Sequence, residues 1–183
     1  MRIAVSGTHC SGKSTLVDEF LAAHRDYAHE PEPYEWLEAL DDGLADVPDA
    51  DAFQRQLEIS VERLRSYAPG TRVIAERSPL DFIAYLLALE ELGREGSDSI
   101  DSAMELARGG MEHVDLLVVL PLNDRDGIAA PQSEDLELRE AMNDRLLELI
   151  ASADFDRVRT IEVSGGRAKR LAMLERALDA RAT

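Results

Sequence analysis

Short apolar runs alternate along the chain with longer segments in which apolar residues recur every three or four positions. The run VDLLVVL is apolar on both faces apart from Asp115, which is typical of a strand in a parallel sheet that is covered on both sides. The other short runs predict further strands of the same kind. The predicted strands are residues 2–6, 27–30, 72–75, 114–120 and 158–163.

The longer segments have the period of amphipathic helices, as when Phe53, Leu57, Val61 and Leu64 fall on one helical face. The predicted helices are residues 14–24, 51–67, 79–92, 97–108 and 134–150, with a closing helix after Gly165-Gly166. Gly109-Gly110 predicts the end of the helix over 97–108. Strands that alternate with helices predict an α/β fold with a parallel sheet, in which ligands bind beyond the carboxyl ends of the strands.

Length, composition and net charge limit the domain number, the partners and the location that fit this sequence. A chain of 183 residues that is 45% apolar suits one domain over residues 1–183. A net charge of −17 disfavours nucleic acid and anionic membranes as partners, and no apolar run is long enough to span a bilayer. One cysteine and a strand at the very start, with no signal peptide, indicate a cytoplasmic protein. A homodimer is compatible with the sequence.

The loop after the first predicted strand carries the most specific motif. Residues 7–14, GTHCSGKS, fit G-x-x-x-x-G-K-S/T without a mismatch. Glycines let the backbone N–H groups turn toward phosphate oxygens, and the following helix adds the positive end of its dipole. Lys13 would reach the β- and γ-phosphates of ATP, and the Ser14 hydroxyl would bind Mg²⁺. The predicted nucleotide-binding residues are Gly7, Thr8, His9, Cys10, Ser11, Gly12, Lys13, Ser14 and Thr15. His9 and Cys10 occupy variable positions and are interpreted as spacers.

The strand over 72–75 leads into the stretch ERSPLD, residues 76–81. ERS resembles the Glu-Arg-Ser of deoxynucleoside kinases, and Glu76-Arg77-x-x-x-Asp81 resembles the ATPase/kinase family that includes nicotinamide-riboside kinase domains. The resemblance implies that Glu76 holds a Mg²⁺-bound water or takes a proton and that Arg77 positions a substrate. The alternative is a surface Glu-Arg pair with Asp81 as a helix cap.

A second stretch, HEPEPYEW, lies in a segment over 26–51 with ten acidic residues and no lysine or arginine. Deoxynucleoside kinases have Glu-Pro at the end of the second strand, and that glutamate is the base for the sugar hydroxyl. Glu30 and Glu32 both match this role, because an attacking hydroxyl must lose its proton. The alternative is an acidic loop stiffened by proline.

The third stretch, over 123–146, resembles the lid of the same kinases, with the lid itself at about 123–140. Lid arginines neutralise the charge of the transferring phosphoryl group, and Arg125, Arg139 and Arg145 are the candidates. The alternative for Arg139 and Arg145 is pairing with nearby glutamates on an exposed helix.

Together these motifs predict a P-loop NTPase three-layer sandwich with about five parallel strands, helices on both faces and a small lid. The expected activity is ATP- and Mg²⁺-dependent phosphoryl transfer to a small nucleoside- or nucleotide-like substrate. Glu30, Glu32 and Glu76 all stay open as the base. The alternative function is a regulatory ATPase or switch without a small-molecule acceptor.

Overall fold

The computed structural model describes residues 1–39, 49–94, 100–123 and 135–180. Five parallel strands form one sheet in the order β2-β3-β1-β4-β5. The strands are β1 (Arg2–Ser6), β2 (Ala28–Glu30), β3 (Val73–Glu76), β4 (Leu116–Val119) and β5 (Thr160–Glu162). All five strands predicted from the sequence are therefore confirmed.

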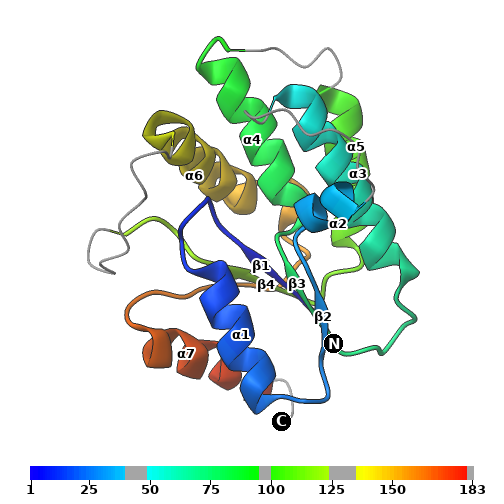
Figure 1. Ribbon diagram of the computed structural model, residues 1–183, viewed down its shortest axis with the longest axis vertical. Coiled ribbons are helices and arrows are strands. Elements are labelled where there is room, and N and C mark those ends of the chain that lie inside the picture. Colours follow the sequence, from blue (N-terminus) through cyan, green and yellow to red (C-terminus); the bar gives the residue numbers. More distant parts are fainter. Residues whose placement is uncertain (40–48, 95–99, 124–134, 181–183) are drawn as a thin grey trace.

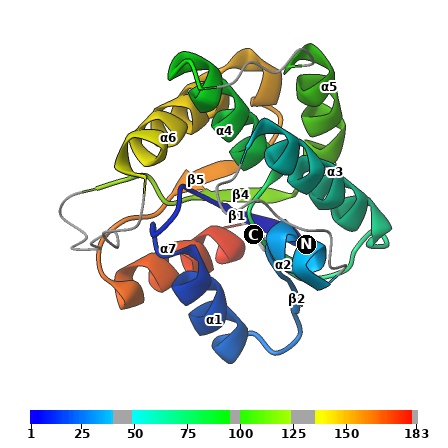
Figure 2. The same ribbon diagram turned by 45° about the horizontal axis from the view of Figure 1, so that its top comes forward.

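Helices cover both faces of the sheet (Figures 1 and 2). Helices α1 (Lys13–Ala23) and α7 (Arg167–Asp179) pack on one face. On the other face lie α3 (Ala50–Ser66), α4 (Pro79–Glu91), α5 (Ile100–Met111) and α6 (Leu136–Ala151). A short helix α2 (Pro33–Ala39) precedes α3, and a 3₁₀ turn η2 (Ala153–Phe155) follows α6. The predicted three-layer α/β sandwich is thus confirmed.

Alternation along the strands builds two separate cores. In β1 the side chains of Ile3 and Val5 enter the core beneath α1 and α7, whereas Ala4 enters the core beneath α3 to α6. Every residue of β4 is buried because both of its faces are covered. The central position of β1 places the loop after it at the middle of the carboxyl edge, with the ends of β3 and β4 on either side.

Helix α2 is an element that the sequence analysis did not predict. Pro31 and Pro33 were interpreted only as the end of a strand, yet Pro33 is the first residue of α2. Proline is well tolerated in the first turn of a helix, because the N–H groups there have no partner within the helix. The segment after β2 is therefore partly a helix.

The predicted end of α5 is wrong. The helix runs through Gly109 and Gly110 to Met111. A Cβ atom on Gly110 would lie 2.7 Å from Cγ2 of Val61 and 2.9 Å from Cγ of Pro79. This glycine therefore serves the close approach of α5 to α3 and α4 rather than the end of the helix.

Two expected segments lie wholly or partly outside the described residues. Most of the expected lid, residues 124–134 with Arg125, lies outside the described residues, as do residues 95–99 before α5. Among the helices that are described, none combines the length and the apolar character needed to cross a bilayer.

Candidate active site

The loop between β1 and α1 has a backbone that depends on glycine at its start. Gly7 has φ of 150°, and a Cβ atom there would lie 2.7 Å from Oγ of Ser11 and 2.8 Å from the Leu120 carbonyl oxygen. Gly12 (φ 92°) and Cys10 (φ 52°) are also left-handed. Successive turns of this kind curl a chain around an anion.

Cationic side chains hold the carbonyls of this loop. Each carbonyl oxygen from residue 7 to residue 11 accepts a hydrogen bond from a lysine or an arginine. The donors are Arg77 to Gly7 (3.3 Å), Lys13 to Thr8 (2.9 Å), Arg139 to His9 (2.9 Å) and Cys10 (3.4 Å), and Arg170 to Ser11 (2.8 Å). Because these carbonyls are engaged, the loop amides after Gly7 and the amino end of α1 are the groups that would face a polyphosphate.

Lys13 is buried at the first position of α1, with 4% of its surface exposed. Its Nζ donates to the Thr8 carbonyl and lies 3.9 Å from Oε1 of Glu32. Burial lowers the pKa of Lys13 to about 8, with Arg77 adding to the shift and Glu32 opposing it. An anion bound beside Nζ would favour the cation and reverse this effect.

Asp81 ties the start of α4 to the start of the loop. Its fully buried carboxylate accepts hydrogen bonds from the Gly7 amide (2.9 Å), the Ser6 hydroxyl (2.6 Å) and the Ser78 amide (2.8 Å). Ser78 and Asp81 also form a capping box. The capping role that the sequence left as an alternative is therefore present, and the same side chain supports the loop.

Arg77, which is buried, forms an ion pair beside the loop with Glu32, which is partly exposed. Arg77 directly follows β3 with a left-handed backbone (φ 69°), and its Nε donates to Glu32 at 3.0 Å. Burial is the largest influence on the pKa of Glu32 and raises it, but the charges of Arg77 and Lys13 together outweigh burial and leave the pKa below its usual value. Glu32 is therefore a carboxylate that two cations stabilise.

Glu30 lies in a different setting. Its carboxylate accepts hydrogen bonds from Trp36 (2.8 Å) and from the Tyr67 hydroxyl (2.5 Å). Arg63 donates to the same carboxylate through Nε and through Nη2, each at 3.0 Å. Arg63 also stacks over the Trp36 ring at 4.3 Å. The Glu30 cluster, defined by these four residues, joins β2, α2 and α3.

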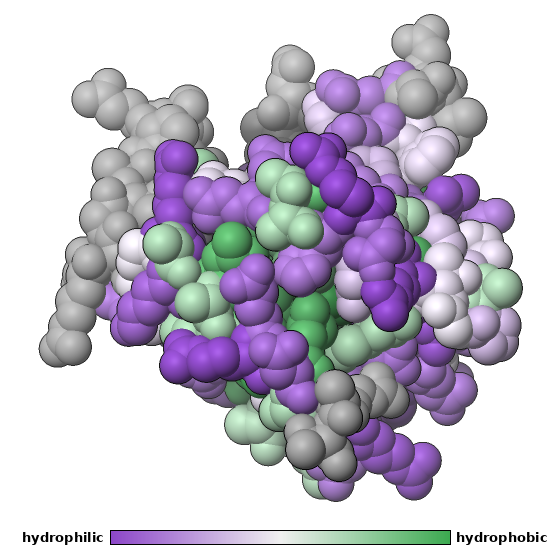
Figure 3. Space-filling view, turned by 90° about the horizontal axis from the view of Figure 1, so that it is seen from below, coloured by the Kyte–Doolittle hydropathy of each residue, from purple (hydrophilic) through white to green (hydrophobic). Residues whose placement is uncertain are grey.

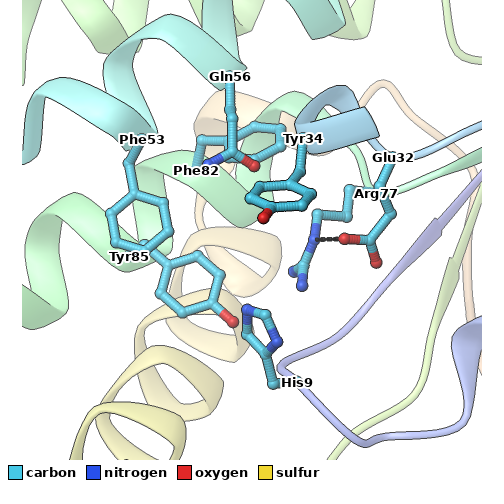
Figure 4. A pocket seen from close by; sticks show the side chains of 8 residues that line it. All are labelled: His9, Glu32, Tyr34, Phe53, Gln56, Arg77, Phe82 and Tyr85. Atoms are coloured by element: carbon cyan, nitrogen blue, oxygen red, sulfur yellow. Dashed lines mark hydrogen bonds and ion pairs between the residues drawn. The ribbon is translucent and has the colours of Figure 1, made fainter. Parts of the chain in front are cut away.

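A cavity of about 150 Å³ opens between the loop, α2, α3 and α4 (Figure 4). Its far end is aromatic: Phe53 and Phe82 lie there, and Tyr85, stacked on Phe53 at 4.3 Å and nearly parallel, extends from it to His9 of the loop. Its near end, at the loop, is polar. The lining residues are His9, Glu32, Tyr34, Phe53, Gln56, Arg77, Phe82 and Tyr85. A planar ring would fit the aromatic end, and the Gln56 amide could both donate to it and accept from it.

The side chain of His9 lines this cavity from the loop. Its ring meets Tyr85 edge-on at 5.7 Å between centroids. Burial, with the cations Arg77 and Lys13 adding to its effect, lowers the pKa of His9 to about 4. The imidazole is therefore neutral at physiological pH.

Glu76 and Ser14 are the residues that could hold a metal ion. Glu76 ends β3 with 6% of its surface exposed, and its Oε1 lies 3.2 Å from Nε2 of His29. Ser14 lies in the exposed first turn of α1. A hydroxyl and a carboxylate are oxygen ligands that suit Mg²⁺, which usually takes one or two protein ligands beside phosphates and water. Within the described residues, no cluster of three or more His, Cys, Asp or Glu side chains could hold a metal by itself.

Arg139 and Arg145, the two lid candidates that the structure describes, have different contacts. Arg139 contacts the loop as described above, whereas Arg145 pairs with Glu91 (2.9 Å) and Glu148 (2.6 Å) on the exposed side of α6. Surface pairing, the alternative left open for both, holds for Arg145.

Sequence reasoning missed Arg170, Gln56 and the aromatic lining of the cavity. Arg170 follows Gly165-Gly166 just as Arg167 does, and no local pattern marks it as the one that turns toward the loop. Phe53 was predicted only as a helix-face residue. Spacing within one helix reveals its buried face, but it does not reveal a gap between that face and a distant segment.

Several solved structures share the fold of this chain. Deoxyadenosine kinase from M. mycoides, solved with dCMP and dCDP, is similar at a TM-score of 0.72 and 17% identity, over 98% of this chain and 100% of that one. Thymidylate kinase from Candida albicans is similar at 0.68 and 16% identity, over 99% and 92% of the two chains. The NadR protein, solved with NR, is similar at 0.70 and 16% identity, over 97% of this chain and 49% of that one.

At such identities the likeness establishes the fold, which is that of the P-loop kinases. No curated protein matches the sequence significantly. A family model described as AAA domain matches residues 2–170. Since this match spans most of its length, the chain belongs to the AAA domain family.

Proposed function

We propose that the protein transfers the γ-phosphoryl group of ATP to a hydroxyl of a small nucleoside-like molecule. The observation that carries the proposal is Glu32, which lies 3.9 Å from the phosphate-loop lysine and also lines the aromatic cavity. A donor held by the loop and an acceptor held in the cavity would meet at this carboxylate. The solved kinases of the same fold support this arrangement by analogy.

Glu32 is the residue that we assign as the base. Its carboxylate faces both Lys13 and the cavity, where an acceptor hydroxyl would lie. Glu30, by contrast, is saturated by three donor side chains in the Glu30 cluster. Glu76 is engaged with His29 and does not line the cavity. We therefore assign Glu30 to anchoring α2 and Glu76 to the metal side of the site.

The charges at the near end favour a hydroxyl over a phosphate as the acceptor group. Arg77 is paired with Glu32 at 3.0 Å and lies 3.7 Å from Asp81, so its positive charge is already balanced. Lys13 would be occupied by ATP. Arg77 is the one lysine or arginine in the described lining of the cavity, so a phosphate dianion there would lack an unpaired cation, whereas a neutral hydroxyl needs none.

The residues present fit Mg²⁺ and ATP as cofactors. Ser14 and Glu76 would hold Mg²⁺, which supplies charge neutralisation to the donor phosphates when bound. The loop amides and Lys13 would bind the polyphosphate, with Arg139 near the transferring group. Arg139 already donates to two loop carbonyls, so its guanidinium lies beside the loop that would hold the phosphates.

Transfer from γ-labelled ATP to a panel of nucleosides and nucleoside monophosphates tests the proposal. We expect labelled nucleoside monophosphate as the product. Glu32→Gln should lower the turnover rate by about 10²-fold or more, in the range for loss of a general base. The matched control is Glu35→Gln, an exposed carboxylate in the first turn of α2, three residues after Glu32.

Two outcomes would count against this function. Labelled inorganic phosphate as the sole product, whether or not a nucleoside is added, would favour the regulatory ATPase instead. Equal rates for Glu32→Gln and Glu35→Gln would remove Glu32 as the base while leaving the transfer reaction itself in place.

A further inference from the structure

We infer that His9, although it belongs to the phosphate loop, binds the acceptor and not ATP, and that it selects for acceptors with a free hydroxyl. The inference rests on the proposed function, since it takes the cavity as the acceptor site. The motif leaves the side chain at this position unspecified, so its chemistry is free to serve something other than phosphate binding.

The backbone and the side chain of His9 face different neighbours. The carbonyl of His9 is held by Nε of Arg139 at 2.9 Å, which fixes this part of the loop. The imidazole lies on the cavity side, edge-on to Tyr85, with Glu32 and Arg77 across the near end (Figure 4). The residue therefore reaches the cavity while its main chain remains part of the phosphate cradle.

A neutral imidazole has hydrogen-bonding properties that its two charged neighbours lack. Arg77 only donates, Glu32 only accepts, and these two side chains are bonded to each other at 3.0 Å. Neutral histidine offers one donor and one acceptor nitrogen. A hydroxyl also donates and accepts, so it can pair with the imidazole in either direction, whereas a phosphate dianion would gain no compensating charge from it.

The aromatic end of the cavity defines the rest of the ligand. Phe53, Tyr85 and Phe82 would stack on a planar ring, and the distance from that end to the loop is spanned by a single small cavity of about 150 Å³. The acceptor class is therefore a small molecule with a planar ring at one end and an uncharged hydroxyl at the other.

Calorimetric titration of the full chain tests the inference directly. The probes are adenosine, deoxyadenosine, deoxycytidine and thymidine, each with its 5′-monophosphate, in the presence of Mg²⁺ and a non-hydrolysable ATP analogue. We expect at least one nucleoside to bind more tightly than its monophosphate. His9→Ala should weaken that nucleoside by roughly tenfold, the loss expected for one hydrogen bond, while the affinity for the ATP analogue alone stays within about twofold.

Two further variants distinguish a hydrogen bond made by His9 from a mere loss of side-chain volume and from a general effect on the fold. His9→Gln keeps a donor and an acceptor and should recover most of the nucleoside affinity. His113→Ala removes an imidazole near the amino end of β4, on the opposite edge of the sheet, and should leave both affinities unchanged.

The inference is overturned if no nucleoside binds, if every monophosphate binds at least as tightly as its nucleoside, or if His9→Ala leaves nucleoside affinity intact. Equal losses of nucleoside and ATP-analogue affinity would also overturn it, because they would indicate a distorted loop. Nucleoside that binds in a His9-dependent way but is never phosphorylated would refute the proposed function and leave the binding role of His9 standing.

Discussion

The phosphate loop makes opposite demands on the individual residues around it. Its amides must face a polyanion, so its carbonyls need partners elsewhere. Four cationic side chains provide them, and hydrogen bonds with a charged partner contribute about 1.5–3 kcal/mol each. The arginines come from the end of β3 and from α6 and α7, so the loop's conformation depends on residues far from it in the sequence.

The depressed pKa of Lys13 leads to a pH dependence of nucleotide binding. In the empty protein the pKa is about 8, and a bound polyphosphate would raise it. Binding above pH 8 must then take up a proton, so the affinity for Mg·ATP should fall by up to about tenfold per pH unit there and stay flat below. Calorimetry between about pH 7 and about pH 9.5 measures this dependence.

Stability and a charge-preserving variant check the same group. The folded-state pKa lies below the usual 10.5, so the unfolded chain binds more protons between about pH 8 and 10.5, and the empty protein should gain stability over that range. Lys13→Arg stays charged throughout, so its affinity for Mg·ATP should not change with pH. A pH-independent affinity in the unmodified protein would contradict the assignment.

Arg170 offers a second test of the cations around the loop. Arg170→Ala would leave the Ser11 carbonyl without its donor, and we expect the affinity for Mg·ATP to fall by about tenfold to a hundredfold. Arg167→Ala, on the exposed side of the same helix, is the matched control and should bind as the unmodified protein does. Comparable affinities for the two variants would show that the Ser11 contact is dispensable.

The elements themselves could largely be read from the sequence, and the exceptions have physical causes. Most of the strands were predicted from apolar runs and β2 from the short stretch that Pro31 ends, and the phosphate loop was predicted because its motif fixes a backbone. Helix α2 was missed because Pro33 was interpreted as a breaker, although it starts the helix. The end of α5 was misplaced because Gly110 has a packing role that only the neighbouring helices reveal.

Replacing each of the two glycines in α5 in turn distinguishes the effect of packing between helices from that of helix propensity. Gly110→Ala would place a methyl group against Val61 and Pro79, and we expect a loss of about 1–3 kcal/mol in the free energy of unfolding. Gly109→Ala would meet only the mobile end of Arg65, at 2.7 Å, and should be neutral or stabilising by up to about 1 kcal/mol. Urea unfolding of both variants measures the difference, and equal effects would argue against the close helix contact.

At the scale of the whole molecule, charge is the dominant feature. The net charge is −17, and hydrophilic residues cover most of the face seen in Figure 3, with a narrow hydrophobic strip near its middle. The candidate site is an exception, because Lys13, Arg77, Arg139 and Arg170 converge on one loop. Composition predicted the overall charge, but this convergence depends on the order of the strands.

Self-repulsion should make the fold sensitive to salt. We expect the thermal unfolding midpoint of the empty protein to rise as ionic strength increases from about 0.01 M to about 0.1 M, where the screening length falls from about 30 Å to about 10 Å. Differential scanning calorimetry in sodium chloride measures the shift. A falling midpoint would mean that surface ion pairs outweigh the repulsion.

The position of Glu32 between two cations has a kinetic consequence. Without bound nucleotide, the positive charges of Lys13 and Arg77 both stabilise the Glu32 carboxylate, which makes it a weak proton acceptor. An arriving polyphosphate would recruit Lys13 and leave Glu32 with one cation, so its basicity would increase only once the donor is in place. In the proposed reaction, the binding of ATP would thus raise the basicity of the carboxylate that later deprotonates the hydroxyl. The base would become active only after the donor has bound.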